Sequence, residues 1–112
     1  MISEVDIKDM EDYQGKAWDF ALPTAKCPPY LFSNLAAEAG EVLSLYAKAV
    51  RDGGSPEEFY FKLEKELGDV LWMMSGIATY YGMSLQDIAE QNIAKLTERK
   101  AKGTLKGSGD TR

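Results

Sequence analysis

Apolar side chains recur every three or four residues along most of the chain, and no stretch alternates apolar and polar residues as a strand does. This pattern predicts four helices, over residues 7–22, 30–52, 55–81 and 84–102, the last two counted from a capping serine. In the first predicted helix, the apolar residues Met10, Tyr13, Ala17 and Phe20 recur with the 3.6-residue period. We therefore expect an all-α fold with two long central helices and shorter ones at either end.

Turn and capping residues mark the ends of these helices. The glycines at 53–54 stop the second helix, and Ser55 suits the N-cap of the third, with Glu58 in the capping-box position. From residue 103 onward, three glycines in ten residues indicate a loop or mobile tail. The sequence therefore predicts a helical domain over residues 1–102 and a glycine-rich tail over 103–112.

A short phrase occurs twice, first as EAGEVL in the second predicted helix and then as ELGDVL in the third. Each copy carries two carboxylates three residues apart, Glu38 with Glu41 and Glu66 with Asp69. On a helix this spacing puts both side chains on one face. Two such helices side by side would gather four carboxylates, which points to a hard divalent metal and to chemistry on phosphates.

The four acids fall on or beside the apolar stripes of their helices. Glu38 lies three residues after Leu35 and four before Val42, and Glu66 repeats this spacing in the third helix. An uncompensated buried carboxylate costs several kcal/mol, and neighbouring carboxylates repel one another. Since neither phrase contains a basic residue, a divalent cation with oxygen ligands, Mg²⁺ or its substitute Mn²⁺, is the better way to neutralise them.

The alternative is that acid pairs at this spacing are ordinary surface charge. For one pair alone that interpretation would be favoured, whereas two matching pairs within apolar stripes favour a metal site. Gly40 and Gly68 stand inside the two phrases, where each costs about 1 kcal/mol relative to alanine in a helix. They suggest close approach of a neighbouring helix or a ligand, and simple close helix packing is equally compatible with them.

A second polar group stands on the last predicted helix. Asn92 interrupts its apolar stripe, and Lys95 and Arg99 follow at helical spacing, so one face offers an amide and two cations that would hold phosphate oxygens. A solvated helix end, with cations near its negative pole, explains them equally well. Lys48 is a weaker candidate of the same kind. Trp18 has the best case among the aromatic residues for stacking on a base, although core packing is the stronger interpretation for each of them.

Composition narrows the function further. The net charge of −5 argues against broad binding to nucleic-acid backbones. The chain has no histidine, which removes Ser-His and Cys-His catalysis and most structural zinc sites. Because Cys27 is the single cysteine, no intrachain disulfide can form and a reducing compartment, the cytoplasm, is expected. Charged residues interrupt every apolar run and no secretory signal is visible, so no membrane span is expected.

These features resemble those of a known family. The pattern Glu38-x-x-Glu41 followed by Glu66-x-x-Asp69 is similar to the signature of the MazG-like all-α nucleoside triphosphate pyrophosphohydrolases. Further segments resemble the short branch of that family found in phages and bacteria: residues 51–54, 66–72 and 92–96, and the closing pattern from Gly103 to Arg112. The likeness covers nearly the whole chain from Tyr13 onward.

The resemblance implies a Mg²⁺-dependent enzyme that cleaves an NTP or dNTP to a monophosphate and pyrophosphate, in nucleotide-pool cleaning or adjustment. It implies the four acids as catalytic metal ligands, and Asn92, Lys95 and Arg99 as triphosphate contacts. It also implies a four-helix bundle assembled as a homodimer or as a homotetramer built from two dimers, with sites where helices of neighbouring subunits meet. The alternatives are a related all-α dUTPase or phosphoribosyl-ATP pyrophosphatase, and a non-catalytic helical dimer that binds nucleotide or protein.

Overall fold

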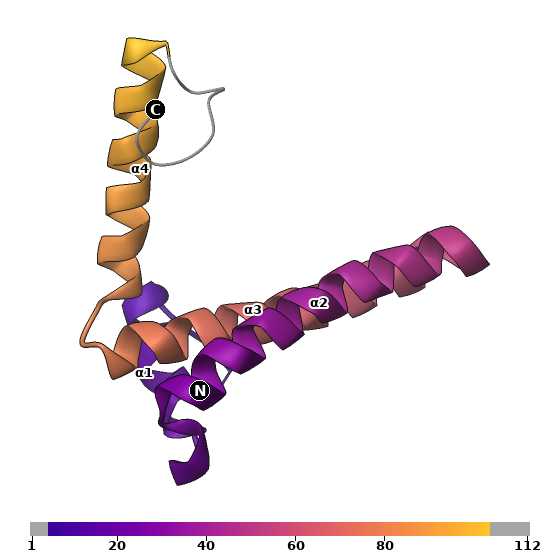
Figure 1. The fold of residues 1–112 in the computed structure, drawn as a ribbon, viewed down its shortest axis with the longest axis horizontal. Coiled ribbons are helices and arrows are strands. Elements are labelled where there is room, and N and C mark those ends of the chain that lie inside the picture. The colour runs from indigo at the N-terminus through magenta and orange to yellow at the C-terminus, as the bar shows by residue number, and fades with distance from the viewer. Residues whose placement is uncertain (1–4, 104–112) are drawn as a thin grey trace.

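The computed structural model describes residues 5–103. Its helices are α1 (Met10–Asp19), the short 3₁₀ turn η1 (Pro23–Ala25), α2 (Pro28–Asp52), α3 (Pro56–Tyr80) and α4 (Leu85–Lys102) (Figure 1). Within residues 5–103 there is no strand, which confirms the all-α prediction. Apart from Gly103, the predicted tail lies outside the described residues. None of the described helices is both long enough and apolar enough to span a membrane.

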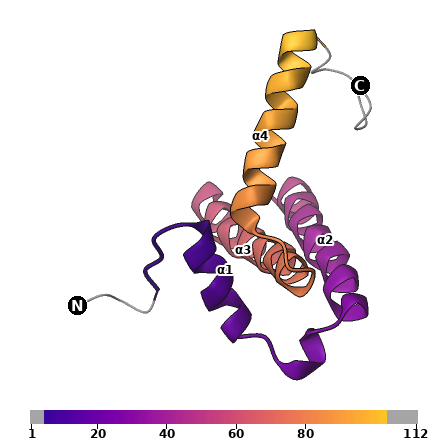
Figure 2. The same ribbon diagram turned by 90° about the vertical axis from the view of Figure 1, so that its left-hand side faces the viewer.

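α2 and α3 form an antiparallel hairpin of two 25-residue helices that lie side by side (Figures 1 and 2). The turn between them is sharp because Gly53 and Gly54 both have positive φ, a conformation that glycine adopts without steric cost. Ser55 then caps α3, and its hydroxyl accepts a hydrogen bond from the Glu58 N–H at 3.0 Å. The predicted helix ends on both sides of this turn are confirmed.

The prediction of a first helix over residues 7–22 is wrong at both ends. The helix begins at Met10 because the Asp9 side chain accepts a hydrogen bond from the Asp12 N–H at 2.8 Å and so forms the N-cap. It also ends earlier than predicted, and the chain then passes through η1. α2 begins at Pro28 rather than at position 30, because the first positions of a helix need no N–H donor and accept proline.

α1 packs against α3 on one flank of the hairpin. The Trp72 indole N–H donates a hydrogen bond to the Ala17 carbonyl at 3.0 Å. The Trp18 ring lies over Gly76, where an added Cβ would stand 3.4 Å from the ring and 3.0 Å from a methyl group of Leu31. Leu31 is fully buried at this point. A small shared core therefore joins α1, α2 and α3.

α4 does not join the other helices in a bundle within one protomer. It leaves the hairpin at a steep angle and extends away from it in both views (Figures 1 and 2). Its helix contacts are chiefly with α1, and its side chains Ile88 and Ile93 are exposed. The predicted four-helix bundle is therefore limited in this protomer to α1, α2 and α3. The direction changes at the α3–α4 turn, where Gly82 has a φ of 71°.

The hairpin carries a second apolar stripe on each helix, and both stripes are exposed. We call these eight side chains the outer apolar face: Phe32, Leu43, Tyr46 and Val50 from α2, and Tyr60, Leu67, Met74 and Tyr81 from α3 and its C-cap. Side chains at these spacings share one side of a helix. The Phe32 and Tyr81 rings, whose centroids are 6.2 Å apart, join the two stripes at one end. Apolar surface of this extent is typical of an interaction site.

The substitution Gly68→Ala is expected to raise the free energy of unfolding by about 1 kcal/mol. A Cβ added at Gly68 would meet nothing within 4 Å, and the same holds at Gly40, so the close approach predicted at these glycines is not found within the protomer. Gly76→Ala is the control and should destabilise the chain, because its Cβ would stand 3.0 Å from Leu31. Urea denaturation measures both changes. A loss of stability in Gly68→Ala would show instead that a second copy packs against this position.

Candidate metal centre

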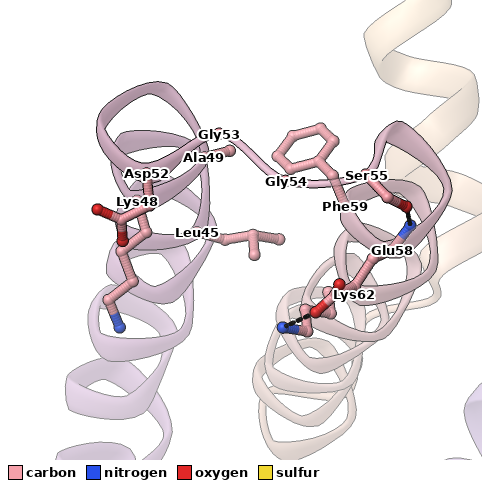
Figure 3. Close-up of a pocket in the computed structure, with 10 residues that line it drawn as sticks. All are labelled: Leu45, Lys48, Ala49, Asp52, Gly53, Gly54, Ser55, Glu58, Phe59 and Lys62. Atoms are coloured by element: carbon pink, nitrogen blue, oxygen red, sulfur yellow. Dashed lines mark hydrogen bonds and ion pairs between the residues drawn. The ribbon is translucent and has the colours of Figure 1, made fainter.

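Three of the four predicted acids meet between α2 and α3. One carboxylate oxygen from each of Glu38, Glu66 and Asp69 lies within 4.8 Å of the other two. Glu38 and Glu66 are half-buried because both lie on the helix faces that contact each other in the hairpin, whereas Asp69 lies at the flank and is exposed. The contact faces of α2 and α3 also carry Leu45 and Phe59, which line a pocket close to the hairpin turn (Figure 3). We call the three acids the acid cluster.

Glu41 stands apart from the acid cluster. It is exposed on the flank of α2, one turn beyond Glu38, and its carboxylate is not among the oxygens that converge. Its negative charge nevertheless acts on Glu38. Within the described residues of one protomer, three of the predicted ligands therefore converge and the fourth lies beside them.

The acid cluster is electrostatically unfavourable without a cation. Burial raises the pKa of the Glu38 carboxyl, and the charges of Asp69, Glu66 and Glu41 raise it further. The ion pairs found within residues 5–103 use other carboxylates, those of Asp12, Asp52, Glu58 and Glu98. Three converging carboxylates that are half-buried on one side and exposed on the other fit Mg²⁺ or Mn²⁺, which take oxygen ligands and keep positions for water and phosphate.

α1 borders the acid cluster through Tyr13. Burial raises the pKa of the Tyr13 hydroxyl, and the charge of Asp69 raises it further. The sequence pattern assigns Tyr13 only to the apolar stripe of the first helix. Nothing in that pattern separates a core tyrosine from one beside a group of acids, because the difference depends on how α1 packs against α3.

The predicted triphosphate contacts on α4 are not brought to the acid cluster within one protomer. Asn92 and Lys95 are exposed and Arg99 is buried. Because α4 extends away from the hairpin and contacts chiefly α1, these side chains and the acids belong to different parts of the molecule (Figure 1).

Lys48 lies at the hairpin turn, in a pocket of about 310 Å³ between the ends of α2 and α3 (Figure 3). It is ten residues from Glu38, which is roughly 15 Å along a helix. The apolar floor of the pocket is formed by Leu45, Ala49 and Phe59, and its charged rim by Lys48, Asp52, Glu58 and Lys62. Since the rim charges balance, and the Lys62 ammonium lies 2.8 Å from the Glu58 carboxylate, this pocket offers no excess positive charge to a phosphate.

Trp18 is half-buried between α1 and α3, with its ring over Gly76. The ammonium group of Lys26 lies 5.3 Å from the centroid of its ring. The contact with Gly76 favours the core interpretation of Trp18 over the prediction that it stacks on a base.

Without divalent metal, Glu38 is expected to make the folded chain less stable as pH rises. The pKa of Glu38 is raised in the folded state, so the folded chain retains a proton that the unfolded chain has lost. This contribution to stability is complete below the ordinary pKa of 4.5 and disappears as pH rises through the raised folded value. Mg²⁺ should restore stability, by about 2.7 kcal/mol at a hundred times its Kd. Thermal melts with EDTA and with Mg²⁺ across this pH range measure both effects.

The control for this prediction is Glu38→Gln. Among residues 5–103, the remaining carboxylates with shifted pKa values, those of Asp12, Asp52, Glu58 and Glu98, titrate in the opposite sense and are present in both proteins. The difference between the two melting curves therefore isolates Glu38. Identical pH profiles for the two proteins, or no response of either to Mg²⁺, would contradict the assignment of a metal site to the acid cluster.

Comparison with known proteins agrees with this geometry. The model of the MazG nucleotide pyrophosphohydrolase domain matches residues 28–104, which include the acid cluster and α4. The "Gene 37 protein" of Mycobacterium phage L5 is 36% identical to the chain over 85 residues, which cover 74% of this chain and 75% of that protein. No solved structure matches the chain. By its converging carboxylates and by the extent of these matches, the chain belongs to the family of MazG nucleotide pyrophosphohydrolase domains.

Proposed function

We propose that this protein is a Mg²⁺-dependent nucleoside triphosphate pyrophosphohydrolase that converts an NTP or dNTP to the monophosphate and pyrophosphate. The observation that carries the proposal is the convergence of Glu38, Glu66 and Asp69 in a chain of the MazG family. A cation held by a few carboxylates shares its remaining positions readily with phosphate oxygens. The biological role that fits is cleaning or adjustment of the nucleotide pool, in the cytoplasm.

In this mechanism Glu38, Glu66 and Asp69, whose carboxylates converge, would hold the cation. When bound, Mg²⁺ supplies charge neutralisation for the phosphates and lowers the pKa of a water ligand. Glu41 is exposed beside the cluster, and it is the acid we assign to accept the proton of the water that attacks the α-phosphorus. The half-buried Glu38 and Glu66 hold their positions because both sit in the contact between α2 and α3.

The triphosphate contacts come, in this proposal, from α4 of a second copy of the chain. Lys95 and Arg99 carry charge opposite to that of the acid cluster, and Asn92 lies on the same helix, yet α4 extends away from the acids of its own protomer. A site completed by a second copy brings the two groups together. The cations would then stabilise negative charge on the departing pyrophosphate.

The outer apolar face supports assembly as a homodimer or a homotetramer. Its eight side chains are each 44% to 68% exposed in the protomer. Exposed aromatic and aliphatic side chains are enriched in surfaces that bury each other in a symmetric dimer. Two hairpins packed through these faces would form a four-helix arrangement, so the predicted bundle is proposed here for the assembly rather than for the protomer.

The proposal is tested by measuring pyrophosphate and monophosphate release from a panel of NTPs and dNTPs, with Mg²⁺ and with EDTA. We expect metal-dependent turnover of at least one nucleotide, with equal amounts of the two products. Release of inorganic phosphate in place of pyrophosphate, or no turnover of any nucleotide, would overturn the proposal. Including dUTP and phosphoribosyl-ATP in the panel separates the two related enzymes from a broader pyrophosphohydrolase.

A further inference from the structure

The Gln14 side chain is buried between α1 and the α3–α4 turn, with 9% of its surface exposed. Its amide nitrogen donates to the Thr79 hydroxyl at 3.0 Å and to the Met83 carbonyl at 2.8 Å. Its amide oxygen accepts a hydrogen bond from the Leu85 N–H at 2.8 Å. Both donor hydrogens and the acceptor are therefore used, on partners at the end of α3, in the turn and at the start of α4. We call this set of bonds the Gln14 clasp.

The bond to Leu85 closes the beginning of α4. The first N–H groups of a helix have no partner within the helix. Ser84 satisfies one of them, since its hydroxyl accepts from the Asp87 N–H at 3.1 Å. The Leu85 N–H is satisfied instead by a side chain from α1, and Leu85 itself is buried. α1 thus fixes the first turn of α4 at two levels, by a hydrogen bond and by burial.

The same helix also borders the acid cluster. The charge of Asp69 raises the pKa of Tyr13, which is next to Gln14 in sequence. The Ala17 carbonyl accepts the hydrogen bond from Trp72, which lies three residues beyond Asp69. α1 therefore contacts α3 beside the acid cluster and also contacts the first turn of α4. Because α4 has its main helix contacts with α1, the orientation of α4 relative to the hairpin depends on α1.

We propose that Gln14 is a positioning residue, which sets the direction of α4 and so places Asn92, Lys95 and Arg99 relative to the acid cluster of the partner copy. The role given to α4 in substrate binding rests on the proposed function, whereas the Gln14 clasp and its effect on the direction of α4 do not. Gln14 touches neither the acids nor, in this proposal, the nucleotide. It acts through the angle between α4 and the hairpin.

The direct test measures the orientation of α4. In a Cys27→Ser background, spin labels at Arg51→Cys and Lys100→Cys report the distance between the tip of the hairpin and α4, both positions being exposed. Labelled protein is diluted into an excess of unlabelled protein so that distances within one chain dominate. We expect one narrow distance distribution with Gln14 present, and a shifted or broadened one in Gln14→Leu, which keeps the volume and removes all three bonds.

Two further variants keep the test decisive if Gln14→Leu folds poorly. Thr79→Val removes one bond only, so a smaller change of the same kind is expected. Gln14→Glu retains the acceptor for Leu85 but at neutral pH sets a carboxylate against the Met83 carbonyl, so it should also alter the distribution. Gln91→Leu, an exposed glutamine substituted on α4 itself, should leave the distribution unchanged. An unaltered distribution in the Gln14 variants, with a lowered melting temperature alone, would show that Gln14 is merely structural and overturn the inference.

Kinetics provide the second readout. Because Gln14 positions the α4 contacts to the triphosphate and not the metal ligands, we expect kcat/KM to fall about tenfold in Gln14→Leu while the affinity for Mg²⁺ stays unchanged. A loss of Mg²⁺ affinity, or an unchanged kcat/KM, would contradict this positioning role. The distance measurement needs no turnover. An absence of hydrolysis in the wild-type protein would therefore overturn the proposed function, while the spin-label distances would still test whether Gln14 orients α4.

Discussion

Replacing Glu38 by glutamine will strongly reduce metal-dependent pyrophosphate release and at the same time stabilise the metal-free protein. The carboxylate lies within 4.8 Å of those of Glu66 and Asp69, and burial together with three neighbouring charges raises its pKa. Glutamine removes this repulsion and keeps the shape of the side chain, so the melting temperature in EDTA should rise. It also removes a charged ligand, so Mg²⁺ affinity and turnover should fall.

The expected loss of turnover is about a hundredfold or more, since even residues that only support a metal ligand cost 10- to 100-fold when replaced. Glu64→Gln is the matched control, because Glu64 is an exposed residue of α3 outside the acid cluster. It should leave turnover and Mg²⁺ affinity unchanged. Calorimetric titration of Mg²⁺, thermal melts in EDTA and the pyrophosphate assay together measure the prediction. Near-normal turnover in Glu38→Gln would move the metal site away from the acid cluster.

A mixture of Glu38→Gln and Lys95→Ala subunits will recover activity that neither variant has alone. If each site combines the acids of one copy with α4 of another, the mixed dimer contains one site with both changes and one site with neither. Random exchange puts half of the subunit pairs in this mixed form, so an equal mixture should recover about a quarter of the wild-type rate. The variants are mixed before refolding, or coexpressed, so that subunits exchange.

The control for this complementation is a mixture of Glu38→Gln with Glu66→Gln. Both changes fall in the acid cluster, which α2 and α3 of a single chain supply. Every site in the mixed dimer is then damaged, and no activity should return. Recovery in this control would show that the acids of one site come from two chains, and no recovery with Lys95→Ala would show that α4 does not complete the site of a second copy.

The helices and the acid cluster were predictable from sequence because they depend on local signals. Helical periodicity, the glycines at 53–54 and the Ser55 cap define a hairpin, and the repeated spacing of Glu38 and Glu66 puts an acid on each contact face. A period of 3.6 residues fixes which face a side chain occupies. It is therefore enough to predict that Glu38 and Glu66 face the neighbouring helix, but it does not separate Asp69, which joins the acid cluster, from Glu41, which does not.

The direction of α4 and the role of α1 could not be predicted in this way. They depend on bonds between residues far apart in sequence, such as those that Gln14 makes to Thr79, Met83 and Leu85. A buried glutamine has no periodic signature. The start of α1 was missed for a different reason, because the hydrogen bond from the Asp12 N–H to the Asp9 side chain sets the N-cap although the apolar pattern begins earlier.

The location of the acid cluster within one hairpin has a consequence for the order in which the protein folds. All three converging carboxylates lie between residues 38 and 69, on two helices joined by a short turn. Such local contacts form early, because little chain entropy is lost in closing the loop between them. Closure of the hairpin must bring like charges together, and a divalent cation removes that obstacle. The metal is thus expected to accelerate the folding of the hairpin before α1 and α4 have docked, so that the ion of the proposed reaction would also speed the formation of its own site.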